Sequence, residues 1–339
     1  MSSSTSVLQS FARRSISGQT IHNGPNHQRV YDSIVDLIAN PDNPTPMVRL
    51  SDRYNANPDF DIFIKLESFN PFGSIKDRTA LYLLRGTPLE EGQILAEPTA
   101  GNTGIALAAL ANAQGTTIEL AVPEATPEEK KILLRFLGAE LLEVEDELCP
   151  LFPTEGARGV VKSMVESAAF GGKYVSPNQY ENELNVEAHY CTTGPEIWNQ
   201  TGGDIDYFFA AFGTCGTITG VGRYLKERNP NIKIIGIEPA NRNHKLSGIK
   251  KISDLPDEHK PKILDYSLID EIIAVTDRDA FEAAIELARS EGIMVGPTTG
   301  ALLHAARQTG ALAKGRAVVI SPDGAGKYVS AYAGYLGDN

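Results

Sequence analysis

The 339-residue sequence lacks the features that would place a protein in a membrane or on nucleic acid. No apolar run approaches the ~18 residues that a membrane-spanning helix needs. Basic residues are outnumbered by acidic ones, and the net charge of −12 argues against general binding to nucleic acid or to anionic membranes. An acidic protein can still hold a local basic pocket. We therefore expect a water-soluble protein whose partners are small molecules.

Cysteine is also scarce. The chain has three, Cys149, Cys191 and Cys215, which are far apart and lack the spacing of metal ligands. An odd, scattered set favours a reducing compartment, with no structural disulfide and no metal site. We therefore expect a cytoplasmic protein.

The first residues contain no acidic side chain before Asp32, and the serine-rich stretch 2–17 includes Arg13 and Arg14. This composition weakly resembles an organelle transit peptide, but two arginines without an amphipathic repeat are a poor match. The segment also lacks the apolar core of a secretory signal. We favour an N-terminal extension over residues 1–42 that packs on the body of the protein or on a partner subunit.

Strand-like and helix-like segments alternate along the rest of the chain. Runs rich in β-formers predict strands at 47–50, 62–66, 93–96, 117–122, 140–144, 174–175, 207–211, 233–237, 271–275 and 316–320. Apolar periodicity predicts helices at 31–38, 79–84, 104–113, 127–137, 157–167, 187–198, 218–228, 278–290 and 301–312. Such alternation indicates an α/β fold with buried, mostly parallel sheets. The length favours two domains, since it exceeds what one core usually supports.

Lys76 stands where a strand gives way to a helix. The strand 62–66 precedes it, Asn70, Pro71 and Gly73 form a loop, and Ser74 is a candidate N-cap for the following helix. A lysine at the positive end of a helix dipole, and partly desolvated, has a lowered pKa, which favours the neutral, nucleophilic amine. The alternative is a solvated surface lysine, which is the commoner role of this residue type.

Three turns rich in threonine and glycine each lead from a strand into a helix. The turn 213–220 offers backbone N–H groups and two hydroxyls for an anion, but it has no Gly-Lys-Ser/Thr and is not a Walker loop. The turn 97–104 offers hydroxyls and an amide that suit a carboxylate, and the third turn is 296–300. Each of them could be plain helix capping. Together they indicate a ligand site, because open α/β sheets bind ligands at the carboxyl ends of their strands.

These stretches together resemble the fold-type II pyridoxal-phosphate enzymes, specifically the cysteine synthase and cystathionine β-synthase family. The matching text runs collinearly from Asn43 to about Tyr335. It comprises Lys-Leu-Glu at 65–67, Asn-Pro-x-Gly-Ser-x-Lys-Asp-Arg at 70–78, Glu-Pro-Thr-x-Gly-Asn-Thr-Gly at 97–104, Gln-Tyr-x-Asn at 179–182, Thr-Thr-Gly-Pro-Glu-Ile-Trp at 192–198, Gly-Thr-x-Gly-Thr-Ile-Thr-Gly at 213–220 and Pro-Asp at 322–323.

The resemblance implies a two-domain, tryptophan synthase β-like fold in which each domain is a mostly parallel sheet flanked by helices. Residues 70–182 would form the smaller, mobile domain with Lys76 and the carboxylate loop. Residues 43–69 plus 183–335 would form the larger domain with the phosphate loop. A homodimer is also implied by the family alone.

Site residues follow by position from the same resemblance. Lys76 would hold pyridoxal 5'-phosphate as a Schiff base and later carry the proton. The other cofactor-binding residues would be Asn102 at the ring hydroxyl, Thr298 at the pyridine nitrogen, and Gly213, Thr214, Cys215, Gly216 and Thr217 at the phosphate. The substrate carboxylate would be held by Thr99, Ala100, Gly101, Thr103 and Gln179.

The implied reaction is that of a cysteine synthase. O-phosphoserine or O-acetylserine would lose its leaving group by β-elimination to an aminoacrylate, and sulfide would add to give L-cysteine. The alternative is the same β-replacement with another nucleophile, such as homocysteine or an amino acid. A scaffold without catalysis is a third possibility, and the retention of Lys76 and Asn102 argues against it.

The sequence departs from the family at several places. Ala100, Cys215 and Phe72 stand where relatives have serine, glycine and glycine. Lys250 and Lys251 stand where relatives have small residues, with Arg242 and Lys245 just upstream. A cluster of four cations suits a dianionic leaving group and resembles the branch that uses O-phosphoserine, with Lys250 or Lys251 holding the phosphate. A solvated basic loop is the equally weighted alternative.

Overall fold

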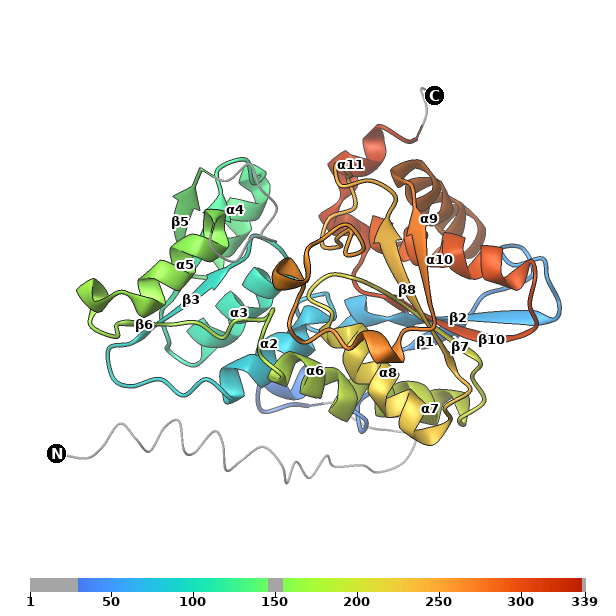
Figure 1. Ribbon diagram of the computed structural model, residues 1–339, viewed down its shortest axis with the longest axis horizontal. Helices are drawn as coiled ribbons and strands as arrows, with labels where there is room; N and C mark the ends of the chain where they lie inside the picture. Colours follow the sequence, from blue (N-terminus) through green and yellow to red (C-terminus); the bar gives the residue numbers. More distant parts are fainter. Residues whose placement is uncertain (1–29, 146–154, 337–339) are drawn as a thin grey trace.

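The computed structural model describes residues 30–145 and 155–336 and consists of two α/β bodies that lie side by side (Figure 1). A six-stranded sheet forms the centre of one body and a four-stranded sheet the centre of the other. The α/β class predicted from the sequence is therefore confirmed. Most of the expected N-terminal extension and Cys149 lie outside the described residues, and within them Cys191 and Cys215 are free thiols.

The six-stranded sheet has the order β1-β2-β10-β7-β8-β9, with β1 antiparallel to β2 and the other pairs parallel. Successive residues along a strand of this sheet point to opposite faces and pack in different hydrophobic cores. Phe209 and Val319 pack with α9 and α10, whereas Phe208 and Val318 pack with α7 and α8. Both faces are covered, which explains why these strands are apolar throughout rather than alternating. The bounds are β1 (Met47–Arg49), β2 (Phe60–Leu66), β7 (Tyr207–Ala211), β8 (Lys233–Pro239), β9 (Glu271–Val275), β10 (Gly315–Ser321), α7 (Gly194–Thr201), α8 (Gly216–Arg228), α9 (Asp277–Glu291) and α10 (Pro297–Gly310).

The four-stranded sheet has the order β5-β4-β3-β6 and is parallel throughout. On one face Leu95 and Leu120 pack with α2, α3 and α4, and on the other Ala96 and Ala121 pack with α5. The bounds are β3 (Ile94–Pro98), β4 (Ile118–Pro123), β5 (Glu140–Val144), β6 (Tyr174–Val175), α2 (Lys76–Arg85), α3 (Asn102–Ala113), α4 (Glu128–Phe136) and α5 (Gly156–Glu166).

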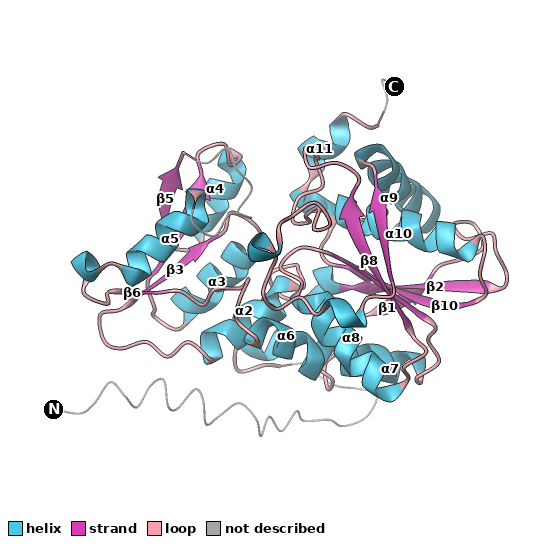
Figure 2. Cartoon of the chain, viewed as in Figure 1, coloured by secondary structure: helices cyan, strands magenta, loops and turns pink. Residues whose placement is uncertain are grey.

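The helices α6 (Leu184–Ala188) and α11 (Val329–Ala333) and several short turns complete the described elements (Figure 2). The short turns are η1 (Ile34–Leu37), η2 (Glu67–Phe69), η3 (Ala168–Phe170), the π-helical η4 (His189–Thr193), η5 (Asp257–His259), η6 (Tyr266–Leu268) and η7 (Ala325–Lys327).

Every predicted strand is present with its ends within two residues of the prediction. The helix predicted at 31–38 is wrong, because the chain forms only the 3-10 turn η1 there. Beyond Ile38 the backbone is bound elsewhere, since Ala39 N–H donates to Asn70 and the Ala39 carbonyl accepts from Arg78. The helix predicted at 187–198 is a continuous run of α6, η4 and α7. The predicted domain boundaries stay a prediction.

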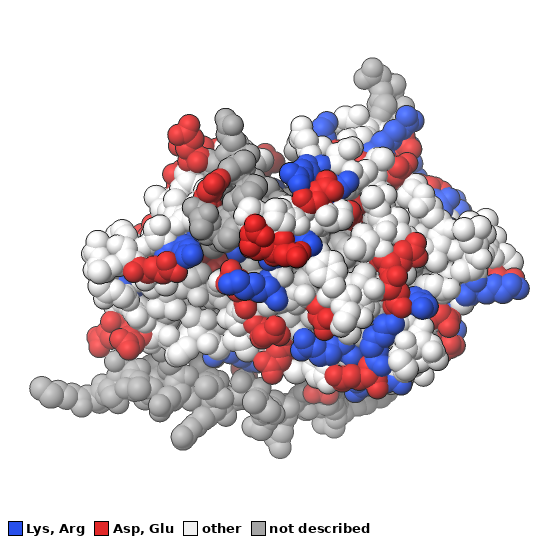
Figure 3. All heavy atoms as spheres, viewed as in Figure 1, with Lys and Arg blue, Asp and Glu red and all other residues white. Residues whose placement is uncertain are grey.

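On the face shown in Figure 3, Lys and Arg side chains are interspersed with Asp and Glu rather than gathered into a patch of one sign. None of the helices in residues 30–145 and 155–336 is long and apolar enough to cross a bilayer.

Candidate active site

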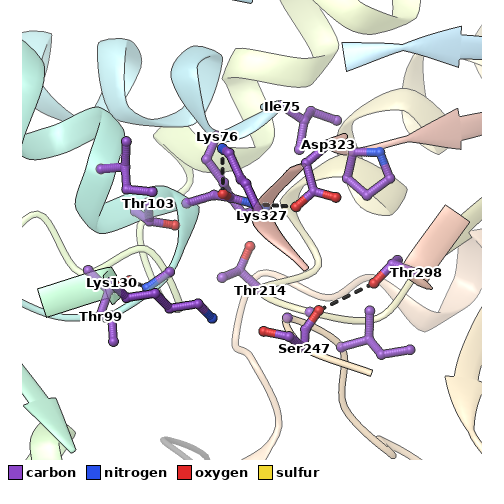
Figure 4. A pocket seen from close by; sticks show the side chains of 18 of the residues that line it. Ile75, Lys76, Thr99, Thr103, Lys130, Thr214, Ser247, Thr298, Asp323 and Lys327 are labelled. Carbon is purple, nitrogen blue, oxygen red and sulfur yellow. Dashed lines mark hydrogen bonds between the residues drawn. The ribbon is translucent and has the colours of Figure 1, made fainter. Parts of the chain in front are cut away.

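A cavity of about 880 Å³ lies between the two sheets. Its walls include residues at the carboxyl ends of β3, β4, β7 and β10, namely Pro98, Pro123, Ala211 and Ile320. Parallel α/β sheets bind their ligands at this end. Figure 4 shows Lys76, Thr103, Thr214, Thr298 and Asp323 arranged around the same space.

Lys76 is the first residue of α2, and the loop before it is tied down on both sides. Ile75 N–H donates to the carbonyl of Pro322 at the end of β10 (2.9 Å). Asp77 accepts from the Phe72 N–H (2.6 Å), which folds the loop back onto the helix. Ser74 does not occupy the N-cap position as predicted, because Ile75 does, yet the Ser74 hydroxyl still accepts from the Lys76 N–H (3.2 Å).

The amine of Lys76 is a desolvated group without a counter-ion in contact. Lys76 lines the cavity, and its Nζ makes no hydrogen bond or ion pair with any residue that the structure describes. Burial lowers the pKa of Lys76, and the more distant Cys215 and Asp323 offset this only in part. The direction is the one predicted from the sequence, and it favours the neutral, nucleophilic amine. Lys76 is not a solvated surface lysine.

Asn102 begins α3 and is held by two groups from the end of the chain. Its Nδ2 donates to Asp323 Oδ2 (2.6 Å), and its Oδ1 accepts from Lys327 Nζ (2.7 Å). Lys327 also donates to the Phe72 carbonyl (3.1 Å), and Tyr328 donates to Asp323 (2.5 Å). Asp323 and Lys327 line the cavity. Neither Asp323 nor Lys327 was predicted from the sequence to be a site residue.

The predicted phosphate loop follows β7 and enters the first turn of α8. Gly213, Thr214, Cys215 and Thr217 line the cavity, whereas Gly216 is not among the described lining residues. Cys215 has a left-handed backbone (φ 72°), a conformation that favours glycine over any other residue. Its side chain is buried, and burial raises the pKa of the thiol to about 12. This supports a packing role for Cys215, because a reactive thiol needs a low pKa.

The predicted carboxylate residues lie together at the start of α3. Thr99, Ala100, Gly101, Thr103 and Gln179 all line the cavity. The Thr103 hydroxyl donates to Gln179 Oε1 (2.7 Å), which joins the two segments. The N-terminus of the twelve-residue helix α3 adds unpaired N–H groups and a favourable dipole for an anion.

Thr298 lies in the first turn of α10 and lines the cavity, as expected of a residue facing a ligand. Its hydroxyl donates to the Ser247 carbonyl (3.3 Å; Figure 4). The third threonine-rich turn thus reaches the same space as the other two.

The four predicted cations do not gather at the cavity: of the four, only Lys250 is among the described lining residues, and Arg242 and Lys251 instead share Asp254. Lys250 lines the cavity, is buried, and has its ammonium 5.0 Å from the centre of the Tyr180 ring. Lys251 drops out of the predicted set, because its Nζ donates to the Ala240 carbonyl (2.6 Å) away from the described lining. Arg242 pairs with Asp254, and Lys245 lies against the Tyr335 ring. The two adjacent lysines lie outside any helix or strand, and their side chains diverge, one toward the cavity and the other toward Ala240.

A buried network of charges lies behind the helix that carries Lys76. Arg78 donates to Glu67 (2.8 Å and 3.0 Å) and to Glu196 (2.9 Å), and Lys65 pairs with Glu196 (2.6 Å). All four side chains are fully buried. Although burial disfavours the charged forms, Arg78 lowers the pKa of Glu67 to about 2, and the two carboxylates raise the pKa of Arg78. The sequence analysis missed this network.

Comparisons with known proteins agree with this geometry. The sequence profile of the family described as "Pyridoxal-phosphate dependent enzyme" matches residues 38–323. The chain is 41% identical to a cysteine synthase of Aquifex aeolicus over 91% of this chain and 94% of that protein, and 39% identical to cysteine synthase B of Escherichia coli over 82% and 88%. The crystal structure of a cysteine synthase (OASS) of Entamoeba histolytica is similar, with a TM-score of 0.78 and 30% identity over 95% of this chain and 96% of that one. In the described residues, no group of three or more His, Cys, Asp or Glu side chains is placed to hold a metal ion.

Proposed function

Because the chain belongs to the family of pyridoxal-phosphate dependent enzymes, we propose that it is a cysteine synthase. It replaces the leaving group on the β-carbon of an activated serine with sulfide and releases L-cysteine. The names of relatives that cover most of both chains support this activity. The observation that carries the proposal is the cavity itself, where a desolvated lysine that pairs with no described acidic side chain shares one space with the two turns predicted to bind a phosphate and a carboxylate.

The residues of the cavity fit pyridoxal phosphate. The Lys76 amine is uncommitted, the buried Asp323 Oδ1 finds no partner within the described part of the chain, and the loop at Gly213 offers hydroxyls and helix N–H groups to a phosphate. The residues that would hold the cofactor are Lys76, Asn102, Gly213, Thr214, Cys215, Gly216, Thr217 and Thr298. When bound, the cofactor supplies an electron sink for the charge that develops on the substrate α-carbon.

The chain's own groups account for the rest of the chemistry. The carboxylate of the amino acid binds at the N-terminus of α3 through Thr99, Ala100, Gly101, Thr103 and Gln179. This contact orients the α-carbon toward Lys76. The neutral Lys76 amine accepts the α-proton as the bond between the β-carbon and the leaving group breaks, and it returns the proton after the carbon–sulfur bond has formed.

The leaving group proposed here is phosphate, so that O-phosphoserine is the donor. Lys250 supports this choice, since it is a buried cation in the cavity wall and the other predicted cations lie elsewhere. A dianion gains more from a buried ammonium than the neutral ester of O-acetylserine does.

The test supplies sulfide together with either O-phosphoserine or O-acetylserine and measures cysteine. We expect O-phosphoserine to be used, and Lys250→Ala to raise its KM about 10-fold or more while the KM for O-acetylserine changes little. Lys251→Ala is the matched control and should leave the ratio of the two KM values unchanged. Equal effects of Lys250→Ala on both donors would remove the phosphate proposal alone. If neither donor yields cysteine with sulfide, but the enzyme condenses a donor with homocysteine or an amino acid, then the assignment of sulfide as the nucleophile is wrong.

We also propose a cytoplasmic homodimer in which residues 70–182 move relative to 43–69 plus 183–335. The family supports the dimer, and the placement of one sheet in each part supports the division. Light scattering of the purified protein should give twice the 36.6 kDa of the chain. A monomeric mass would overturn the dimer.

A further inference from the structure

Asn185, on α6, lies behind the phosphate loop and is fully buried. Its Nδ2 is 2.8 Å from the Gln179 backbone carbonyl and 2.9 Å from Thr214 Oγ1. A carbonyl oxygen can only accept, so the group that faces Gln179 must be the NH₂ and the orientation of the amide follows. Both amide protons are then in use, and one of them is donated to Thr214.

The oxygen of the same amide determines where the Thr79 hydroxyl donates its proton. Asn185 Oδ1 can only accept, and it lies 3.1 Å from Thr79 Oγ1, so Thr79 donates its one hydroxyl proton there. Thr79 Oγ1 is also 3.2 Å from His189 Nε2. Because the Thr79 proton is already used, this contact requires Nε2 to be the donor.

His189 lies in the π-helical turn η4 and is fully buried. Its Nε2 is also 3.2 Å from Thr217 Oγ1, so one N–H lies between two threonine oxygens. Its Nδ1 is 3.0 Å from Thr193 Oγ1 and can accept that hydroxyl. Burial lowers the pKa of His189 well below its usual value, and Lys76 and Arg78 act in the same direction, which favours the neutral ring. The contact with Thr79 places the proton of that ring on Nε2.

We propose that Asn185 and His189 are positioning residues that direct the hydroxyl protons of Thr214 and Thr217 into the cavity. Each threonine oxygen receives a hydrogen bond from behind, which leaves its own proton to donate forward. The inference rests on the proposed function, in which this loop holds the cofactor phosphate. A phosphate dianion offers acceptors only, so two hydroxyls fixed as donors bind it better than two that rotate freely.

The close packing of α8 makes this arrangement possible. A Cβ on Gly216 would stand 2.1 Å from Asn185 Oδ1, and a Cβ on Gly220 would stand 2.3 Å from the Val186 carbonyl and 2.9 Å from His189 Cβ. Only glycine at these two positions lets the first turns of α8 approach α6 and η4 so closely. Asn185 and His189 are not among the described residues that line the cavity, so they act through the threonines.

The first experiment uses the wild-type holoenzyme labelled with ¹⁵N-histidine. We expect the NMR signals of His189, assigned from their loss in His189→Gln, to show a neutral ring protonated on Nε2. An imidazolium, or a ring protonated on Nδ1, would overturn the proposal. The visible absorbance of the same sample reports whether the cofactor is bound at all, so a failure of the proposed function is seen separately.

The second experiment is a double-mutant cycle on the dissociation constant of pyridoxal phosphate. Asn185→Asp keeps the size of the side chain but cannot donate, so the Thr214 hydroxyl must turn back toward it. We expect about 10- to 100-fold weaker binding for Asn185→Asp and for Thr214→Val, the loss typical of a hydrogen bond to a charged group. The double variant should bind no more weakly than Asn185→Asp alone.

If the losses of binding free energy from the two single variants add in the double variant, Asn185 acts by a route other than Thr214. That result would overturn the proposal. Asn112→Asp is the matched control, because the Asn112 amide likewise donates to a backbone carbonyl (3.0 Å) but on the far part of α3. It should leave the dissociation constant unchanged. If Asn185→Asp fails to fold, the NMR measurement still tests the His189 tautomer that the orientation of the Asn185 amide requires, and a ring protonated on Nδ1 overturns the proposal.

Discussion

Helix α2 carries two basic residues two positions apart, and their surroundings differ: Lys76 is partly exposed to the cavity, whereas Arg78 is fully buried. Lys76 faces the cavity without a hydrogen bond or ion pair to any described residue, and its pKa is lowered by burial. Arg78 faces the interior, donates to Glu67, Glu196 and the Ala39 carbonyl, and has a raised pKa. One side of the helix keeps a group that can react, and the other side fixes the helix in place.

The two cations also differ in what they contribute to folding. A desolvated amine without a partner disfavours the native state, since its protonated form is unfavourable there. A buried arginine between two carboxylates is compensated, and removing it leaves buried charges unpaired. The comparison therefore predicts that Lys76 matters for activity and not for stability, and that Arg78 matters for stability first.

Lys76→Ala should produce the largest change. We expect cysteine formation to fall by roughly 10³-fold or more, because under the proposed function Lys76 is both the attachment point of the cofactor and the proton carrier. The visible absorbance of the lysine-linked cofactor should disappear. The melting temperature of the cofactor-free variant should equal or exceed that of the cofactor-free wild type. A stable covalent link to the cofactor in Lys76→Ala would show that another lysine is the attachment point.

The sequence predicted the cavity side of α2 well, because its signals are local. Lys76 begins a helix directly after a loop marked by Asn70, Pro71 and Gly73, and the threonine-rich turns each follow a strand within a few residues. Runs of β-formers likewise located every predicted strand to within two residues. Where the structure of a segment is decided by its neighbours in sequence, the local residue pattern is enough to predict it.

The rest could not be predicted, because it depends on contacts between distant parts of the chain. Arg78 meets Glu196 across 118 residues, and Lys327 meets Asn102 across 225. The failure of the helix at 31–38 has the same cause, since Ala39 is bound by Asn70 and Arg78. The sequence offers no means of telling which of Lys250 and Lys251 lines the cavity. That depends on the path of the backbone, which directs Lys250 into the cavity and Lys251 away from it.

Arg78→Met tests the predicted role of Arg78 in stability. We expect the free energy of unfolding to fall by about 3–5 kcal/mol, because Glu67 and Glu196 lose a shared buried partner. Urea denaturation measures it. The control is Arg49→Met, since the half-exposed Arg49 pairs with Asp61 at 2.6 Å on the surface, where solvent screens the pair and the loss should be much smaller.

Equal losses in these two variants would mean that the buried network contributes no more than a surface pair. If Arg78→Met does not fold, Arg78→Lys keeps the charge without the forked geometry and should still lose more than Arg49→Lys.

Asp77, between the two cations, should give the smallest and most pH-dependent effect. Burial raises the pKa of Asp77 to about 7 from 3.8, against the hydrogen bond from Phe72 N–H and the charge of Lys327. Between these values the native carboxyl holds a proton that the unfolded one has lost, so stability falls as the pH rises through this window. Asp77→Asn removes that dependence. Relative to wild type, the variant should therefore gain roughly 1–3 kcal/mol as the pH rises from about 4 to 7.

Urea denaturation of both proteins at a series of pH values measures this gain. Parallel stability curves would mean that Asp77 is ionised in the native protein throughout, with the Phe72 and Ser74 hydrogen bonds outweighing burial. In that case α2 would carry a negative charge beside the cavity, and Lys76 would share its environment with a carboxylate. A difference that grows with pH would instead show that the tip of α2 is kept uncharged up to near neutrality. Asp77 would then, like Lys76, be a desolvated group without an ion pair to any described residue, in contrast to Arg78, whose charge is compensated by Glu67 and Glu196.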